Sequence, residues 1–196
     1  MKRLIGLLRP LRAVLLVVAI SPALQGCFPL VATGVGAGVL AAEDRRTTGT
    51  YVEDQSIEIK AAGRLDTTLK DRAHVNVTSY NRNVLLTGEA RDEQVKAQAE
   101  SVVREVPQVR NVINELAIRP NRPLASYAND AYLTSKVKAR MLEAQKFQIN
   151  HVKVVSEDGV VYLLGLVTRK EAEDAAEIAR TTSGVSKVVK VFELLD

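Results

Sequence analysis

The chain has 196 residues, of which 46% are hydrophobic and 26% are charged, and it contains one cysteine and no tryptophan. Four of its 27 basic residues lie in the first 12 positions, where there is no acidic residue, so beyond them 23 basic residues balance 23 acidic ones. A chain without a basic excess is not expected to bind nucleic acid. A single cysteine excludes an internal disulfide, and the length suits one ordinary domain or two small ones.

The first predicted element is an export signal. Lys2 and Arg3 open a positively charged leader, and an apolar run, Ala13–Ile20, follows it. This run is much shorter than the roughly 20 residues that span a bilayer. The residues Leu24-Gln25-Gly26-Cys27 resemble the lipobox of bacterial lipoproteins. That resemblance implies that residues 1–26 are a signal peptide and that Cys27 is the lipidation site. The alternative is an ordinary signal peptide with an incidental cysteine nearby.

A tether is expected after the cysteine. The stretch Phe28–Ala42 is apolar but rich in glycine and alanine. It is too short for a usual membrane span, and its glycines disfavour a helix. Polar residues follow it, so residues 27–53 are predicted to form the lipidated N-terminus and a flexible tether.

The rest of the chain contains two copies of one unit. The segment that begins "AHVNVTSYNRNVLLTGEA" at Ala73 aligns with the one that begins "NHVKVVSEDGVVYLLGLV" at Asn150. The alignment places His74 on His151 and Gly88 on Gly165. Since self-similarity at a fixed period indicates a repeated structural unit, we predict two domains, residues 54–118 and 129–196. The linker between them, residues 119–128, is short and contains two prolines, so the domains are expected to pack against each other.

Each unit is predicted to fold as helix, strand, strand, helix, strand. In the second copy, Asn129 or Asp130 can cap a helix from about Ala131 to Ala144. A hairpin turn is expected at residues 157–159, and Thr168 to Glu171 has the form of a capping box,. The predicted fold class is therefore α+β, with two tandem domains that each have a three-stranded mixed sheet and two helices on one face.

These units resemble a known family. The order αββαβ, with V-x-V, then V-x-L-x-G-x-V, an alanine-rich helix and G-V-x-x-V, is similar to the BON domain. Two such units behind a lipobox resemble the DolP-like family of dual BON-domain outer-membrane lipoproteins. The resemblance implies a non-catalytic protein without a cofactor, anchored in the outer membrane and facing the periplasm. It also implies binding of anionic phospholipids and support of outer-membrane integrity, including at division sites.

The residues themselves do not indicate catalysis or a metal site. His74 and His151 are the only histidines, and a repeat duplicates any residue of its ancestor. No cluster of cysteine, histidine or carboxylate residues with the spacing of metal ligands accompanies them. Acidic residues alternate with basic ones on predicted helix faces, which is typical of solvated surface. We therefore do not expect an enzyme.

One helix carries a candidate membrane-binding surface. In the first helix of the second domain, Leu133 and Val137 share the face expected to enter the core. Beside them run Tyr132, Lys136 and Arg140, and an aromatic ring with basic neighbours suits an anionic phospholipid interface. The family resemblance maps its phospholipid-binding surface onto these five residues, with Tyr132 where the family has tryptophan.

Two alternatives to phospholipid binding stay open. The helix can be an ordinary amphipathic helix with a partly packed tyrosine. The protein can also be a periplasmic interaction scaffold for envelope-assembly or division proteins. The first domain lacks the aromatic residue, because Ser56 falls near the position of Tyr132, and Gly63 weakens the middle of its helix,.

Overall fold

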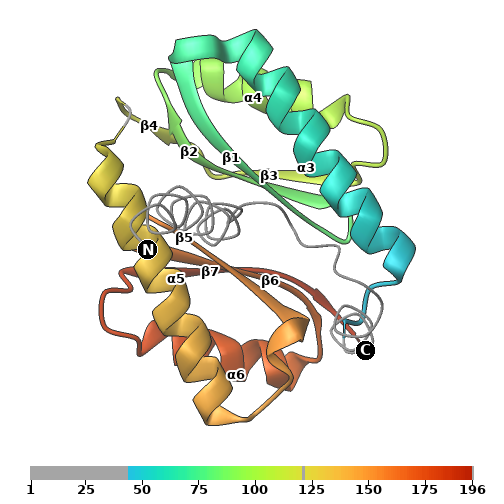
Figure 1. The fold of residues 1–196 in the computed structure, drawn as a ribbon, viewed down its shortest axis with the longest axis vertical. Coiled ribbons are helices and arrows are strands. Elements are labelled where there is room, and N and C mark those ends of the chain that lie inside the picture. The colour runs from blue at the N-terminus through green and yellow to red at the C-terminus, as the bar shows by residue number, and fades with distance from the viewer. Residues whose placement is uncertain (1–43, 121, 196) are drawn as a thin grey trace, which may run out of the picture. The chain divides into compact units, whose positions relative to one another are not determined.

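The computed structural model describes residues 44–120 and 122–195, all within one compact unit of the chain. The predicted signal peptide and Cys27 lie outside the described residues, so their roles stay predictions. The described part consists of two α+β domains that follow each other along the chain (Figure 1). This confirms the predicted fold class.

The first domain has a mixed sheet under two helices. Its elements are α3 (Thr48–Leu69), η2 (Lys70–Arg72), β1 (Ala73–Tyr80), β2 (Asn83–Ala90), α4 (Glu93–Arg104), β3 (Asn111–Asn114) and β4 (Ala117–Ile118). Strand β1 is antiparallel to β2, whereas β3 and β4 are both parallel to β2. The sheet thus has one short strand more than predicted, because the last strand is interrupted where Leu116 turns into the core.

The second domain repeats this arrangement with a three-stranded sheet. Its elements are α5 (Leu124–Ala144), η3 (Ile149–His151), β5 (Val152–Glu157), β6 (Val160–Val167), α6 (Arg169–Arg180) and β7 (Lys187–Leu194). Strand β5 is antiparallel to β6, and β6 is parallel to β7. The capping box predicted at the start of α6 is present between Thr168 and Glu171.

Both helices of each domain pack on one face of its sheet (Figure 1). In the first domain, Ile57 and Ala61 of α3 and Ala99 of α4 are buried against the sheet. In the second domain, Leu133 and Val137 of α5 occupy the corresponding core, as predicted. Each fully buried valine, leucine or isoleucine contributes roughly 1.5–3 kcal/mol to stability, so these apolar stripes hold α3 and α5 in place.

Two helices begin earlier than the sequence predicts. Helix α5 starts at Leu124 and not near Ala131, so several residues of the predicted linker are helical. Pro123 precedes it with a φ angle of −62°, which suits a helix start,. Asp130, predicted as a possible cap, lies inside the helix, and its carboxylate accepts a hydrogen bond from Arg122. Helix α3 likewise includes residues 48–53, which were predicted as tether.

Two glycines determine how closely the strands of each hairpin approach. Gly88 and Gly165 are equivalent in the repeat, and a Cβ at either position would clash with the carbonyl oxygen of His74 or His151. Gly88 also has a φ angle of +117°, which side chains other than glycine rarely adopt,. A side chain at either position would therefore force the two strands of the hairpin apart.

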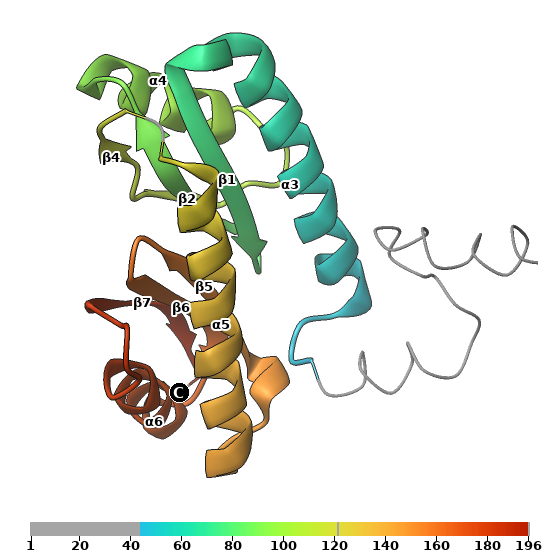
Figure 2. The same ribbon diagram turned by 60° about the vertical axis from the view of Figure 1, so that its left-hand side comes forward.

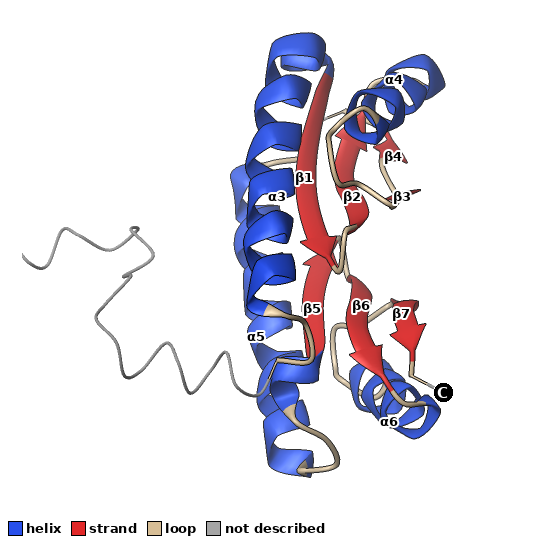
Figure 3. Ribbon diagram, turned by 90° about the vertical axis from the view of Figure 1, so that its right-hand side faces the viewer, coloured by secondary structure: helices blue, strands red, loops and turns tan. Residues whose placement is uncertain are grey.

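The second faces of the two sheets contact each other. Tyr80 and Leu85 of the first domain form one buried cluster with Tyr162, Leu164 and Leu166 of the second. Figures 2 and 3 show where the first helix of each domain lies: α3 runs beside β1, and α5 runs beside β5 on the same side of the strands. The expectation that the domains pack against each other is confirmed.

Candidate functional site

The candidate binding helix, α5, presents two very different faces. Leu133 and Val137 are buried in the core of the second domain, together with Met141. They hold the helix against β5 but do not form part of its surface. Of the five residues predicted to bind phospholipid, these two therefore pack in the core and position the helix.

Lys136 and Arg140 lie at the border of α5 and contact the end of α6. The Lys136 Nζ donates to the carbonyl oxygen of Ser183 at 2.9 Å. The Arg140 Nη1 donates to the carbonyl of Ile178 at 3.1 Å and to the Thr182 hydroxyl at 2.9 Å. Cations at a helix C-terminus interact favourably with its unpaired carbonyls and dipole. These two side chains therefore join the two helices of the domain and leave a basic border along α5.

The solvent-facing side of α5 is apolar in its centre. Tyr132 is 65% exposed and Leu142 is 62% exposed, although both are large apolar side chains. Small exposed residues lie on the same side between them: Ala128, Ala131, Ser135 and Ala139. At 100° per residue, these positions cover roughly a 100° arc of the helix. We call Tyr132, Leu142 and the four small residues the exposed arc.

Lys138 forms the second basic border of the exposed arc. It is exposed, and it makes no hydrogen bond or ion pair with any residue in 44–120 or 122–195. Lys136 and Arg140 border the opposite side. Sequence reasoning missed Lys138 and Leu142, although Leu142 follows Tyr132 at the spacing that keeps a residue on one helix face.

The first domain does not reproduce the exposed arc. Ser56 of α3 stands where α5 has Tyr132 and is half-buried. The most exposed apolar side chain of α3, that of Ile59, is 72% exposed, but it aligns with Ser135 and not with Tyr132. A Cβ at Gly63 would contact nothing within 4 Å, so the middle of α3 is open. The two helices thus share a fold but not a surface.

The beginning of the described chain is held on the second domain by Arg45. Its guanidinium forms two hydrogen bonds with the Glu171 carboxylate, at 2.7 and 2.9 Å, and a third with the carbonyl of Leu166. The hydrogen bonds from Arg45, together with one from the backbone of Thr168, lower the pKa of Glu171 from 4.5 to about 2, although burial acts in the opposite direction,. The described part of the chain therefore begins beside the second domain.

A buried ion-pair network joins the two domains near the linker. The Arg122 guanidinium lies between Glu89 of the first domain, at 2.5 Å, and Asp130 of the second, at 2.9 Å, and it also pairs with Glu157. Burial lowers the pKa of Arg122, but the hydrogen bonds to the carboxylates outweigh it and raise that pKa overall. Tyr127 donates its hydroxyl to Glu89 and packs under the Arg122 guanidinium.

Sequence reasoning did not predict this network, although a signal for it existed. The spacing Arg122, Tyr127, Asp130 repeats that of Arg46, Tyr51, Asp54 in the first domain. There, the guanidinium of Arg46 binds the Asp54 carboxylate at 2.8 Å and lies over Tyr51. The repeat unit therefore begins earlier than the alignment of the strands suggests.

The two histidines have separate structural surroundings. His74 stacks near the ring of Tyr127 with a centroid distance of 4.9 Å, whereas the Nδ1 of His151 lies 3.5 Å from Glu171. Within the described ranges, no group of three histidine, cysteine or acidic side chains is placed to hold a metal ion. In the same ranges, no helix has the length and apolar character needed to traverse a bilayer.

Two αββαβ domains joined through their sheets define a class of tandem-repeat α+β proteins.

Comparison with known proteins identifies the family. The BON domain model matches residues 53–120 and 129–196. Outer membrane lipoprotein DolP of Haemophilus influenzae is 40% identical over 194 residues, which cover 96% of this chain and 99% of that protein. The chain therefore belongs to the BON family, as a dual BON-domain protein of the DolP-like type.

Two further relatives match about three quarters or more of the chain. A 21 kDa hemolysin of Actinobacillus pleuropneumoniae is 33% identical over 151 residues, which cover 76% of this chain and 78% of that protein. Osmotically-inducible protein Y of Escherichia coli is 29% identical over 160 residues, which cover 80% of each protein.

Proposed function

We propose that this protein is a non-catalytic outer-membrane lipoprotein that binds anionic phospholipid through its second BON domain and supports outer-membrane integrity, including at division sites. In this proposal Cys27 carries the lipid anchor and both domains face the periplasm. The name of the Haemophilus influenzae relative supports the location. The observation that carries the binding site is the exposed arc of α5, in which Tyr132 and Leu142 are uncovered between basic borders.

The arc has the chemistry of a helix that lies in a membrane interface. Such helices bury an apolar face at the level of the headgroups, while cations on both borders meet lipid phosphates. The Tyr132 ring suits headgroup depth, because it is apolar with a polar tip. Lys138 on one border and Lys136 and Arg140 on the other supply the positive charge.

The expected affinity is modest. Burying a leucine side chain contributes roughly 1.5–3 kcal/mol, and each cation near an anionic surface adds about 1 kcal/mol. Leu142 and the three border cations together give about 5 kcal/mol, which corresponds to a dissociation constant of about 0.2 mM. Because acyl chains on Cys27 would already hold the protein at the bilayer, the arc needs only to select the lipid patch and orient the domains.

A tryptophan introduced at Tyr132 would test this site directly, since the chain contains no other tryptophan. The full chain carrying Tyr132→Trp is reconstituted into vesicles of phosphatidylcholine with or without phosphatidylglycerol. The emission should shift to shorter wavelength only with the anionic lipid, and salt should weaken the shift because it screens exposed charges. Adding Lys138→Glu and Leu142→Ser should remove it.

The matched control is Gln94→Trp on α4, an exposed position on the second helix of the first domain. Its emission should be the same in both kinds of vesicle. If Tyr132→Trp also gives the same emission in both kinds of vesicle, the exposed arc does not bind anionic phospholipid. The interaction-scaffold alternative would then be favoured.

A further inference from the structure

The outer edge of β7 is a free sheet edge of eight residues. Strand β7 pairs with β6 on one side and is the last strand of its sheet. Apart from its ladder with β6, no hydrogen bond from another described residue reaches the backbone of residues 187–194. Half of the N–H and C=O groups of a strand point away from its partner, so this edge offers a row of unpaired backbone groups.

The other sheet edges are less available. In the first domain, β3 has four residues and is interrupted before β4. The opposite edge strand, β1, has eight residues, but the Ser79 backbone N–H donates to the Glu58 carboxylate at 2.8 Å and the Ser79 carbonyl accepts from Lys153 at 3.4 Å. At the far edge of the second sheet, β5 is bridged to the first domain, because Lys153 binds Glu58 at 2.9 Å and Glu157 accepts a hydrogen bond from Asn76 at 3.1 Å. Strand β7 is therefore the long edge whose outer backbone groups make no hydrogen bond with another described residue.

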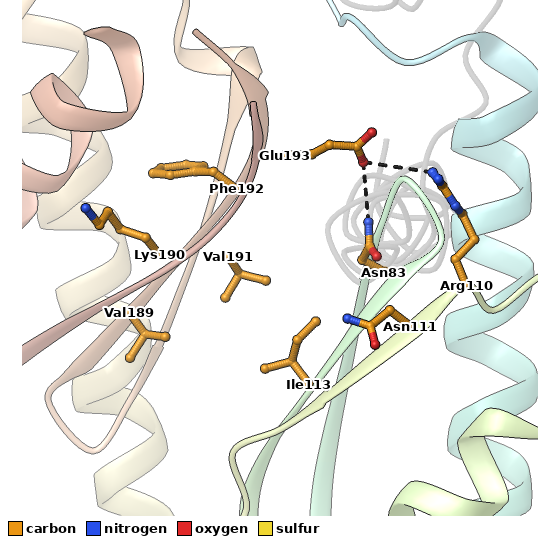
Figure 4. Close-up of a pocket in the computed structure, with 9 residues that line it drawn as sticks. All are labelled: Asn83, Arg110, Asn111, Ile113, Val189, Lys190, Val191, Phe192 and Glu193. Atoms are coloured by element: carbon orange, nitrogen blue, oxygen red, sulfur yellow. Dashed lines mark hydrogen bonds and ion pairs between the residues drawn. The ribbon is translucent and has the colours of Figure 1, made fainter. Parts of the chain in front are cut away.

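A hollow lies on the first-domain side of β7. It has a volume of about 520 Å³ and separates the edge of β7 from the edge of β3. Figure 4 shows Val189, Val191 and Ile113 directed into this space, with Glu193 and Arg110 at its rim. The rim pair is weak, with 3.9 Å between the Arg110 guanidinium and the Glu193 carboxylate. The hollow can accept apolar side chains.

A second hollow lies on the opposite side of the same strand. It has a volume of about 530 Å³, and α6 and β7 line it. Val188 and Lys190 contribute from β7, and Glu173, Asp174, Ala176, Glu177 and Arg180 contribute from α6. Asp174 and Glu177 have basic partners, whereas the exposed Glu173 makes no ion pair or hydrogen bond with the part of the chain described. Glu173 is therefore the acidic group in this hollow that can pair with an incoming basic side chain.

We propose that the edge of β7 is a docking site for an extended segment of another protein in which apolar and basic residues alternate. Addition of a strand to a free sheet edge takes affinity from main-chain hydrogen bonds and specificity from pockets for alternate side chains. Here the apolar side chains enter the hollow beside Val189 and Val191, and the basic ones face Glu173. Lys187 and Lys190 on the strand disfavour indiscriminate pairing, as charges on natural edge strands do.

The test uses an acetylated, fluorescently labelled octapeptide of alternating valine and lysine and the full chain in detergent micelles. Fluorescence anisotropy should show saturable binding. An octapeptide of alternating valine and glutamate should bind at least about tenfold more weakly. A valine-lysine peptide with N-methyl groups on alternate residues should not bind, because it lacks the hydrogen-bond donors.

Two variants locate the peptide. Glu173→Lys should weaken binding about threefold to tenfold, as expected when one exposed ion pair becomes a repulsion. The matched control is Glu93→Lys, an exposed acidic position on α4, and it should bind like the unaltered chain. Amide hydrogen exchange should slow in residues 187–194 when the peptide is bound.

The absence of binding, equal binding of the N-methylated peptide, or protection of an edge other than β7 would overturn the proposal. Concentration-dependent dimerisation that protects residues 187–194 without peptide would also overturn it, since the edge would then serve a second copy of this chain.

Discussion

Replacing Arg122 by methionine should destabilise the protein more than any loss of an exposed ion pair. Methionine keeps much of the length of the arginine side chain but removes its charge and all its hydrogen-bond donors. Arg122 is the shared partner of Glu89, Asp130 and Glu157. Since Glu89 belongs to the first domain and the other two belong to the second, the substitution acts on the contact between the domains.

The size of the expected loss in unfolding free energy follows from the burial of the ion pair. The Glu89 side chain is 0% exposed, and that of Arg122 is 8% exposed. Removing one partner of a buried ion pair costs about 3–5 kcal/mol, because the remaining charge stays buried without compensation. After the substitution, the partners that Glu89 keeps among the described residues are Arg119 at 3.4 Å and the Tyr127 hydroxyl at 3.2 Å. We therefore expect the free energy of unfolding to fall by about 3–5 kcal/mol.

Urea denaturation of the full chain in detergent micelles, followed by far-ultraviolet circular dichroism, measures this change. The control is Arg104→Met, which removes an exposed pair with Glu100 on α4. Exposed pairs contribute about 0–1 kcal/mol, so the control should unfold nearly like the unaltered chain. If Arg122→Met costs less than about 1 kcal/mol, the network behaves like a surface pair, and the reasoning from burial is refuted.

Three other predictions concern separate parts of the fold. Gly165→Ala should lower the free energy of unfolding by about 1–3 kcal/mol, because its Cβ would meet the carbonyl of His151,. Gly63→Ala should instead raise it by about 0.5–1 kcal/mol, because alanine stabilises the middle of α3. If both variants unfold at the same urea concentration as the unaltered chain, both predictions are wrong. Glu171, with its pKa lowered to about 2, contributes stability that is complete above about pH 4.5 and is lost as the pH falls toward 2,. Arg45→Ala should raise that pKa and reduce this acid dependence, which urea titrations at several pH values would detect; an unchanged dependence would show that Arg45 is not the cause. Tyr132→Ala should leave the unfolding free energy within about 0.5 kcal/mol, as for other exposed positions, and any larger loss would indicate that Tyr132 has a packing role.

Much of the fold was predictable from local patterns. The apolar face of α5 and the capping box at Thr168 each depend on residues within a few positions of one another. The start of α5 was not predictable in this way. Asn129 and Asp130 are good caps in isolation, but Asp130 binds Arg122 in the structure, and the helix continues back to Pro123.

The candidate site was only partly predictable for a related reason. Periodicity identified Tyr132 as a surface residue and Leu133 and Val137 as core residues. It could not show that Lys136 and Arg140 bind the end of α6, because their partners lie about 40 positions later in the chain. It also did not identify Leu142 as exposed, since an apolar residue near the end of a helix is equally compatible with burial.

The sequence by itself determined the two repeated units, their α+β order and the family to which they belong, because these depend on short-range patterns and their repetition. Only the tertiary structure decided which side chains are free. The open edge of β7, the buried position of Arg122 between two domains and the exposed arc of α5 all depend on which surfaces cover one another. Covering is a property of packing between distant segments, and no local pattern in the sequence encodes it.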